Sequence, residues 1–153
     1  MSIYELPLMT EDTSIEDAFN HLVNTGKGAI VVKMTDGARI FPAQHLHLQL
    51  PGEASKSLRE AAGGLWCPES DADTILEQHL DIALLDTSSN RAKVSVLSDN
   101  AVIRGMFLAL KTYTCNGPSK HKYYPWQLSS LKPAGTNRWE CMNCTRPPVR
   151  YVT

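Results

Sequence analysis

The sequence predicts an α+β protein in which a small mixed α/β layered domain, residues 1–110, is followed by a β module, residues 111–153, that packs on it. Helical and β-hairpin patterns alternate through the first region, which is typical of layered α+β domains. The two regions also differ in charge. The first carries 8 Lys+Arg and 15 Asp+Glu, a net charge of −7, whereas the second carries 7 Lys+Arg and a single acid, a net charge of +6. Three of the four cysteines lie in the second region, so the two parts are expected to differ in chemistry.

The overall composition is that of an ordinary globular protein. With 153 residues, 42% of them hydrophobic and 20% charged, the chain is long enough to form a stable core without cross-links. No apolar run approaches the roughly 18 to 20 residues needed to cross a bilayer, so no membrane interaction is predicted. The first residues lack the pattern of a signal peptide, which favours a cytoplasmic location. In such a reducing compartment, closely spaced cysteines are more often metal ligands than disulfides.

The first elements can be predicted from local signals. Thr13-Ser-Ile-Glu16 matches a capping box, which predicts a helix start, and Gly26 is a plausible stop. Residues 28–34 are rich in β-branched side chains and predict a buried strand. Asp36-Gly37 then predicts a hairpin turn into a second strand over 38–41, which Pro42 ends or confines to a sheet edge.

The next segments are less uniform. Residues 45–50 alternate polar and apolar side chains, which fits either a strand or the start of a short helix, and Pro51-Gly52 interrupts the pattern. Further helices are predicted over 55–62 and from Ser70 or Asp71 onward. Strands are predicted over 81–86 and 92–97, and residues 102–110 are apolar enough for either a strand or a buried helix. No exact internal repeat is visible.

Residues 14–41 resemble one half of a CBS domain: a capped helix, a buried strand, an Asp-Gly turn and a short strand. The resemblance implies paired repeats and the binding of adenosine nucleotides. In that family, a Thr or Ser and a following Asp after the last strand hold the ribose and phosphate. Here that stretch runs from Pro42 to Leu46 and contains no Asp, so the expected ligand residues are missing.

A candidate metal site lies in the C-terminal region. Cys115 and His121 are spaced as C-x5-H, and Cys141 and Cys144 as C-x2-C after a connection of nineteen residues. A C-x2-C turn lets two thiolates converge on one tetrahedral ion. The segment resembles zinc ribbons, in which two short loops clamp one zinc ion, although its first loop departs from the usual C-x2-C. We therefore predict a bound Zn²⁺ ion. A reduced cysteine pair beside a solvent-facing histidine remains the alternative.

The predicted zinc is structural. Catalytic zinc sites usually keep three protein ligands, an open water position and a nearby carboxylate, whereas four good ligands are available here and Glu140 is the only acid in the segment. The zinc-deaminase signature is also absent. Cys67 could replace His121 as the fourth ligand, but a buried, inert thiol is its expected state.

Two other groups of polar residues have simpler explanations than catalysis. His45 and His47 could share a strand face and bind a metal, but solvent-facing histidines are the favoured interpretation. Asp71 and Asp73 are explained by helix capping. No phosphate-binding glycine loop, nucleophile elbow or H-E-x-x-H helix is present, so no catalytic residues are predicted.

The C-terminal region is also rich in aromatic and basic side chains, which could stack on bases and contact phosphates, or could instead cover the metal loops. The latter role is favoured for Tyr113, Trp126 and Trp139, and both roles stay open for Tyr123, Tyr124 and Arg146.

The sequence thus predicts a non-enzymatic, zinc-containing binding or regulatory protein that engages another macromolecule. One alternative is a nucleic-acid-binding protein that uses the basic aromatic surface of the C-terminal module. A second is a small enzyme or nucleotide sensor built on residues 10–110. The identity of the partner and the oligomeric state are not predicted.

Overall fold

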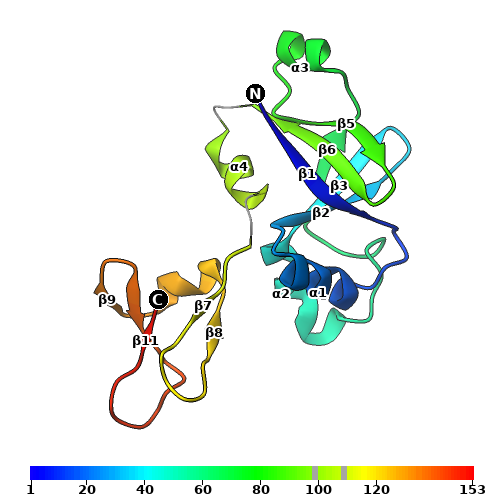
Figure 1. Cartoon of the computed structure of the whole chain (residues 1–153). Helices are drawn as coiled ribbons and strands as arrows, with labels where there is room; N and C mark the ends of the chain where they lie inside the picture. The colour runs from blue at the N-terminus through cyan, green and yellow to red at the C-terminus, as the bar shows by residue number, and fades with distance from the viewer. Residues whose placement is uncertain (98–99, 108–109) are drawn as a thin grey trace. The chain divides into compact units, whose positions relative to one another are not determined.

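The computed structural model describes residues 1–97, 100–107 and 110–153 (Figure 1). The chain divides into two compact units, residues 1–110 and residues 111–153. Both helices and strands are present, and the largest sheet contains parallel and antiparallel pairs. The predicted α+β class is therefore confirmed. None of the described helices is long and apolar enough to span a bilayer.

The first unit repeats one order of elements, β-α-β-β-α. The first repeat contains β1 (Ser2–Met9), α1 (Ile15–Thr25), β2 (Ala29–Lys33), β3 (Gly37–Pro42) and α2 (Ala43–Glu53). The second contains β4 (Leu65–Pro68), α3 (Ala72–Gln78), β5 (Ile82–Ser88), β6 (Arg91–Val96) and α4 (Ala101–Phe107). The sequence shows no matching periodicity, because the two copies share topology rather than residues and their helices differ in length.

The strand pairing repeats as well. The six strands are ordered β4-β3-β2-β1-β6-β5. Within the first repeat β1 is parallel to β2, and β2 is antiparallel to β3; in the second, β5 is antiparallel to β6. The third strand of each repeat lies antiparallel to the first strand of the other. The edge strands β4 and β5 are joined by a parallel bridge between Glu69 and Leu84, so the sheet curls round on itself.

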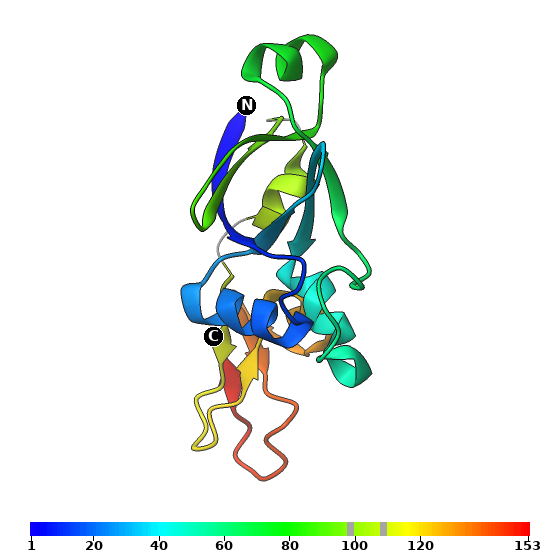
Figure 2. The same ribbon diagram turned by 90° about the vertical axis from the view of Figure 1, so that its right-hand side faces the viewer.

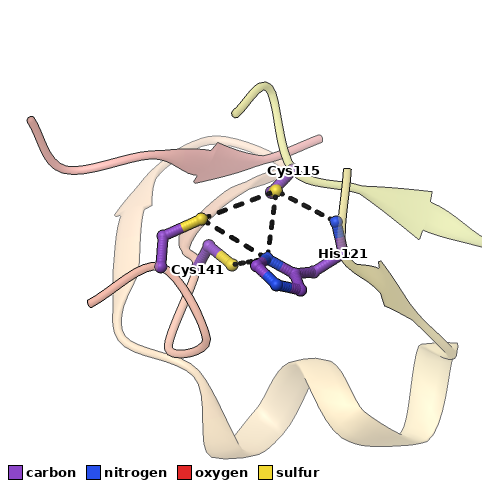
Figure 3. A group of neighbouring side chains, drawn as sticks. Cys115, His121 and Cys141 are labelled. Carbon is purple, nitrogen blue, oxygen red and sulfur yellow. Dashed lines mark hydrogen bonds between the residues drawn. The ribbon is translucent and has the colours of Figure 1, made fainter. Parts of the chain in front are cut away.

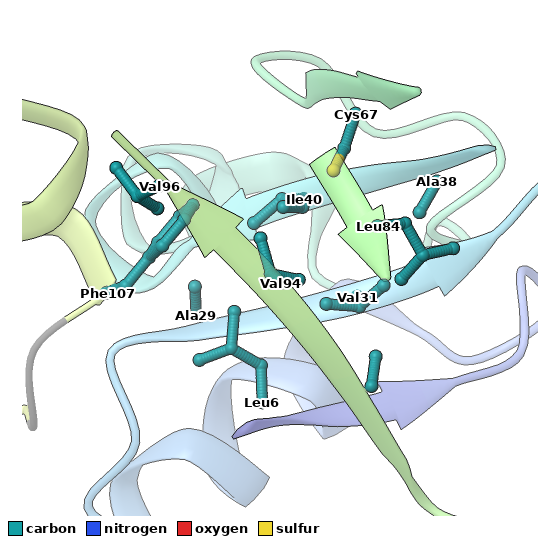
Figure 4. Close-up of a cluster of buried hydrophobic side chains, with 11 residues drawn as sticks. Leu6, Ala29, Val31, Ala38, Ile40, Cys67, Leu84, Val94, Val96 and Phe107 are labelled. Carbon is teal, nitrogen blue, oxygen red and sulfur yellow. The ribbon is translucent and has the colours of Figure 1, made fainter. Parts of the chain in front are cut away.

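One hydrophobic core fills the concave side of this sheet. Alternate residues of the strands point into it, as a strand's two-residue period requires (Figure 4). Phe107 of α4 joins the cluster, and its ring packs edge-on against Tyr4 at 5.8 Å between centroids. β2 is buried on both faces: Ala29 and Val31 belong to this cluster, and the alternate residues Ile30 and Val32 are also buried. Helices α1 and α2 pack side by side against β2 and β3 (Figure 2).

Helix α1 begins one residue later than the capping-box prediction. The N-cap is Ser14, whose hydroxyl accepts a hydrogen bond from the backbone N–H of Asp17 at 3.1 Å. The Thr13 hydroxyl instead lies 3.3 Å from that of Thr10. The predicted stop at Gly26 is confirmed, because this residue adopts a left-handed conformation with φ 71° and its N–H bonds to the Leu22 carbonyl.

Some of the remaining predictions for the first unit are confirmed, and others are wrong. The Asp36-Gly37 hairpin between β2 and β3 is confirmed, as are strands close to 81–86 and 92–97. Residues 45–50 are helical, within α2, and the described part of 102–110 lies in helix α4 up to Phe107, while 108–109 fall outside the described residues. The helix predicted over 55–62 was wrong, because these residues form turns against α1. Strands β1 and β4 were not predicted.

The second unit consists of short strands and one 3-10 helix. Its elements are β7 (Tyr113–Thr114), β8 (Lys122–Tyr123), the 3-10 helix η1 (Pro125–Ser130), β9 (Pro133–Gly135), β10 (Arg138–Glu140) and β11 (Tyr151–Val152). β7 and β8 form a hairpin, and the other strands form a sheet ordered β11-β10-β9. A bridge between Cys115 and Val152 connects the hairpin to this sheet. Two loops, one after β7 and one after β10, therefore end up beside each other.

Candidate metal centre

The first candidate metal-binding loop closes the β7–β8 hairpin, with Cys115 and His121 at its two ends. The Cys115 N–H donates to the His121 carbonyl at 3.0 Å, and the His121 N–H donates to the Cys115 sulfur at 3.2 Å. Within the loop, Lys120 takes a left-handed conformation with φ 45°. This closure allows a C-x5-H loop to place both ligands on one side of the hairpin, which the commoner C-x2-C loop does with fewer residues.

The second candidate metal-binding loop follows β10 and contains Cys141 and Cys144. The Cys141 N–H donates to the Arg150 carbonyl at 2.8 Å, which ties the loop to the start of β11. Inside the loop, the backbone N–H groups of Asn143 and Cys144 hydrogen-bond the Cys141 sulfur. Amides pointed at a sulfur stabilise the thiolate, which is the form that binds metals.

The four predicted ligands converge on one point. Figure 3 shows three of them, Cys115, His121 and Cys141, pointing toward one another. Their ligand atoms all lie within 4.8 Å of one another. The His121 Nδ1 atom lies 3.6, 3.5 and 3.4 Å from the sulfurs of Cys115, Cys141 and Cys144, and the sulfurs of Cys115 and Cys144 are 3.8 Å apart.

These separations fit four ligands arranged tetrahedrally around one ion better than they fit hydrogen bonds among the ligands. With Zn–S bonds of about 2.3 Å and Zn–N bonds of about 2.0 to 2.1 Å, a regular tetrahedron places two sulfurs about 3.8 Å apart and a sulfur and a nitrogen about 3.5 Å apart. The four separations given above agree with these values within about 0.2 Å. The four residues could therefore hold a metal ion.

The cysteines are not cross-linked, and Cys67 takes no part in the cluster. All four thiols are free, and the 3.8 Å between Cys115 and Cys144 is far beyond the roughly 2.05 Å of a disulfide. Cys67 is fully buried in the core of the first unit, where burial raises the pKa of its thiol to about 12. It is the inert thiol that the sequence predicts.

The electrostatics of the cluster favour a cation. Burial raises the pKa of Cys141, but hydrogen bonds from the Tyr123 hydroxyl and from backbone amides outweigh it and lower this pKa to about 6. Burial and the neighbouring thiols of Cys141 and Cys115 raise the pKa of Cys144 to about 11. Thiolates this close together repel one another, and a divalent cation between them removes that repulsion.

Tyr123 is a candidate positioning residue for the site that the sequence does not reveal. Its side chain is only 3% exposed, and its hydroxyl lies 3.1 Å from the Cys141 sulfur. A hydroxyl in this place donates to the thiolate and orients it, and such partners tune metal sites strongly. The role of Tyr123 as a surface platform for bases is thereby excluded. The only sign of this role in the sequence is that Tyr123 lies two residues after His121, and alternate residues of a strand point to the same face.

Gly117 is needed for close packing around the ligands. A Cβ at this position would lie 3.3 Å from the Cys144 sulfur and 3.0 Å from the Arg150 Cγ. These contacts are tighter than side chains normally tolerate, so the bare backbone of Gly117 lets the two loops approach each other.

Most aromatic rings of the second unit pack against neighbours. Tyr113 and Trp139 meet edge-on at 5.8 Å, and Tyr124 stacks on Trp126 at 4.9 Å. The Arg138 guanidinium lies 3.7 Å above the centre of the Tyr151 ring, so this ring is covered on one face. Tyr113 and Trp139 pack against the buried cluster that contains Cys115 and Cys141, as expected for rings that cover the ligand loops, whereas the contact of Trp126 with Tyr124 does not test that role.

The histidine and aspartate pairs of the first unit do not form metal sites among the described residues. His45 and His47 lie on helix α2, where residues two apart point in different directions. Both side chains are half-buried rather than fully solvent-facing. The His45 Nδ1 lies 2.7 Å from the Gly63 carbonyl, and the His47 ring packs at 5.4 Å on that of Phe19. Asp71 caps α3 as predicted, accepting from the Thr74 N–H at 2.7 Å.

Comparison with known proteins gives no relative for this chain. No family model matches it, and no similar protein was found among curated proteins or solved structures. The function is therefore inferred from the geometry of the site.

Proposed function

We propose that Cys115, His121, Cys141 and Cys144 bind one structural Zn²⁺ ion. The observation that carries this proposal is the convergence of the four ligand atoms at tetrahedral spacing. Three thiolates and one imidazole suit zinc among the common biological metals. Mg²⁺ and Ca²⁺ prefer oxygen ligands, whereas a tetrahedral site of sulfur and nitrogen atoms is typical of zinc.

The structural role follows from the ligand count and from the small core of the second unit. Four protein ligands complete a tetrahedron and leave no position for a reactive water molecule. The buried cluster of this unit has six residues, and two of them, Cys115 and Cys141, are ligands. A unit of 43 residues with so little apolar interior falls in the size range in which metals or disulfides are usually needed for folding.

We further propose that the protein is a non-enzymatic binding or regulatory protein in which zinc holds a basic recognition module in shape. The excess of positive charge in residues 111–153 supports a role in contacting an anionic macromolecule. Three free thiols as ligands require reducing conditions, which supports the cytoplasmic location.

Metal analysis of the purified full chain tests the zinc assignment. We expect one zinc per chain, with X-ray absorption showing three sulfur neighbours and one nitrogen neighbour. Cys141→Ser and Cys144→Ser should each lower the zinc content, whereas Cys67→Ala should retain it because Cys67 lies outside the cluster. Chelation should abolish the dispersed amide NMR signals of residues 111–153 and spare those of residues 1–110. Full zinc content in both serine variants would refute the assignment.

A nucleotide or metabolite sensor built on residues 10–110 is a second candidate. The paired β-α-β-β-α repeats support it, because the CBS resemblance of residues 14–41 implies such pairs. A pocket of about 290 Å³ also lies between β1, the end of α1 and the β5–β6 turn. It is lined by Glu5, Leu6, Pro7, His21, Thr25, Lys27, Asn90 and Arg91.

Thermal unfolding of the full chain with a panel of nucleotides and metabolites distinguishes this candidate. A ligand that binds only the native state must raise the melting temperature. If no compound does so at millimolar concentration, the sensor hypothesis fails, while the zinc assignment is unaffected.

A further inference from the structure

We propose that the groove between the two metal-binding loops docks a short acidic segment of a partner protein. This inference rests on the proposed zinc site, because the ion holds both walls of the groove. The groove has a volume of about 410 Å³. Its walls are formed by Pro118, Ser119 and His121 of the first loop, and by Asn143, Cys144, Thr145, Arg146, Pro147 and Arg150 of the second loop and the chain after it.

The lining of the groove favours an anionic ligand. It contains two guanidinium groups, two hydroxyls and one amide, and no carboxylate. The only acid in this unit, Glu140, pairs with Lys132 at 3.5 Å and does not line the groove. Binding of Zn²⁺ by three thiolates changes the net charge of residues 111–153 from +6 to +5, so the unit stays strongly basic. A carboxylate entering the groove therefore meets donors and positive charge.

Arg150 is held in place by the metal-binding loops themselves. Its carbonyl accepts from the Cys141 N–H at 2.8 Å, and its side-chain stem passes over Gly117, where a Cβ would come within 3.0 Å of it. At the next residue, the Tyr151 carbonyl accepts from the Asn116 N–H at 2.9 Å, and the Tyr151 N–H donates to the side-chain Oδ1 of Asn116 at 3.1 Å. Because these contacts join both loops, the position of Arg150 depends on the fold around the ion. Binding to the groove should consequently depend on zinc.

The surface next to the groove favours a polypeptide over a nucleic acid. Met142 and Val149, the chain neighbours of Asn143 and Arg150, are 64% and 53% exposed. Apolar side chains beside paired arginines suit a segment in which acidic and apolar residues alternate. Stacking of bases needs accessible aromatic rings. No Phe, Tyr or Trp lines the groove, and its one imidazole belongs to the ligand His121.

Selection from a phage-displayed library of random 12-residue peptides on the immobilised, zinc-loaded full chain tests this proposal. We expect enrichment of peptides that combine Asp or Glu with large apolar residues. The selected peptides are then synthesised with a fluorescent label, and their affinities are measured by anisotropy alongside a labelled oligothymidylate. The same measurements are made on Arg146→Gln and on Lys122→Gln, which removes an equal charge from an exposed strand residue outside the groove.

Arg146→Gln should weaken peptide binding by about tenfold or more, because a hydrogen bond between charged groups contributes more than one between neutral groups. Lys122→Gln should change the affinity by less than about threefold, as expected for a charge outside the contact. The proposal is overturned if no acidic peptide is enriched, if both variants bind equally, or if only the oligothymidylate binds with sensitivity to Arg146→Gln. Zinc content is measured for each protein. Absence of peptide binding by the zinc-loaded wild-type chain refutes the groove alone, whereas an absence of zinc from the wild-type chain refutes the proposed function.

Discussion

Replacing Tyr123 by Phe isolates the hydrogen bond between its hydroxyl and the Cys141 sulfur. The two atoms are 3.1 Å apart, the side chain is 3% exposed, and Phe keeps the ring that belongs to the buried cluster. Loss of a hydrogen bond to a metal ligand typically weakens metal binding by about 10- to 100-fold, or roughly 1.4 to 2.8 kcal/mol. The hydroxyl also helps to lower the Cys141 pKa, so without it this thiol competes less well for zinc against protons.

The zinc affinity of the variant is measured by titration against a chromophoric chelator at constant pH. Tyr113→Phe is the matched control, because the Tyr113 ring packs on Trp139 and its residue is not a ligand. We expect the control to bind zinc with nearly wild-type affinity. A Tyr123→Phe affinity within twofold of the wild type would show that the hydroxyl does not contact the thiolate, and the geometric reasoning about the site would fail.

Four further predictions concern packing, capping and pH. Gly117→Ala pushes a Cβ against a ligand sulfur, so the cost of overpacking, about 1 to 3 kcal/mol, should appear as weaker zinc binding in the same titration. Ser14→Ala should lower the free energy of unfolding by about 1 kcal/mol in urea denaturation, and Thr13→Ala by less than half as much. The reverse order would show that Thr13, as the capping box predicted, is the N-cap of α1. Gly37→Ala places a Cβ against a backbone carbonyl oxygen of β4 and should cost at least about 1 to 3 kcal/mol, so an unchanged urea midpoint would contradict the β3–β4 register. Burial lowers the pKa of His47 in the folded protein below its ordinary value of about 6.5. As the pH falls through about 6.5, His47 is therefore protonated in the unfolded chain before it is protonated in the folded one, and the free energy of unfolding decreases. His47→Gln should reduce this acid sensitivity of the melting temperature, and an identical pH profile would exclude His47 as its source.

The features that could be predicted from sequence depend on residues close together in the chain. The C-x2-C turn, the Asp36-Gly37 hairpin and the stop at Gly26 are each specified by a few neighbouring side chains and their allowed backbone angles. The cap of α1 was misplaced by one residue because Thr13 and Ser14 are both good caps, and only the surrounding turns select between them. The helix predicted over 55–62 had suitable composition, but contacts with α1 hold these residues in turns instead.

The sequence by itself determined the ligand types and the charge of residues 111–153, because composition and short spacings can be read without a fold. Only the tertiary structure decided that His121, rather than Cys67, joins the three thiols of the second unit, since residues 67 and 115 belong to separate compact units. It also decided the curled sheet with its paired repeats, and it placed the Tyr123 hydroxyl on a ligand sulfur. Such contacts join residues far apart in the chain, and their free energy depends on burial and distance, which no local pattern specifies.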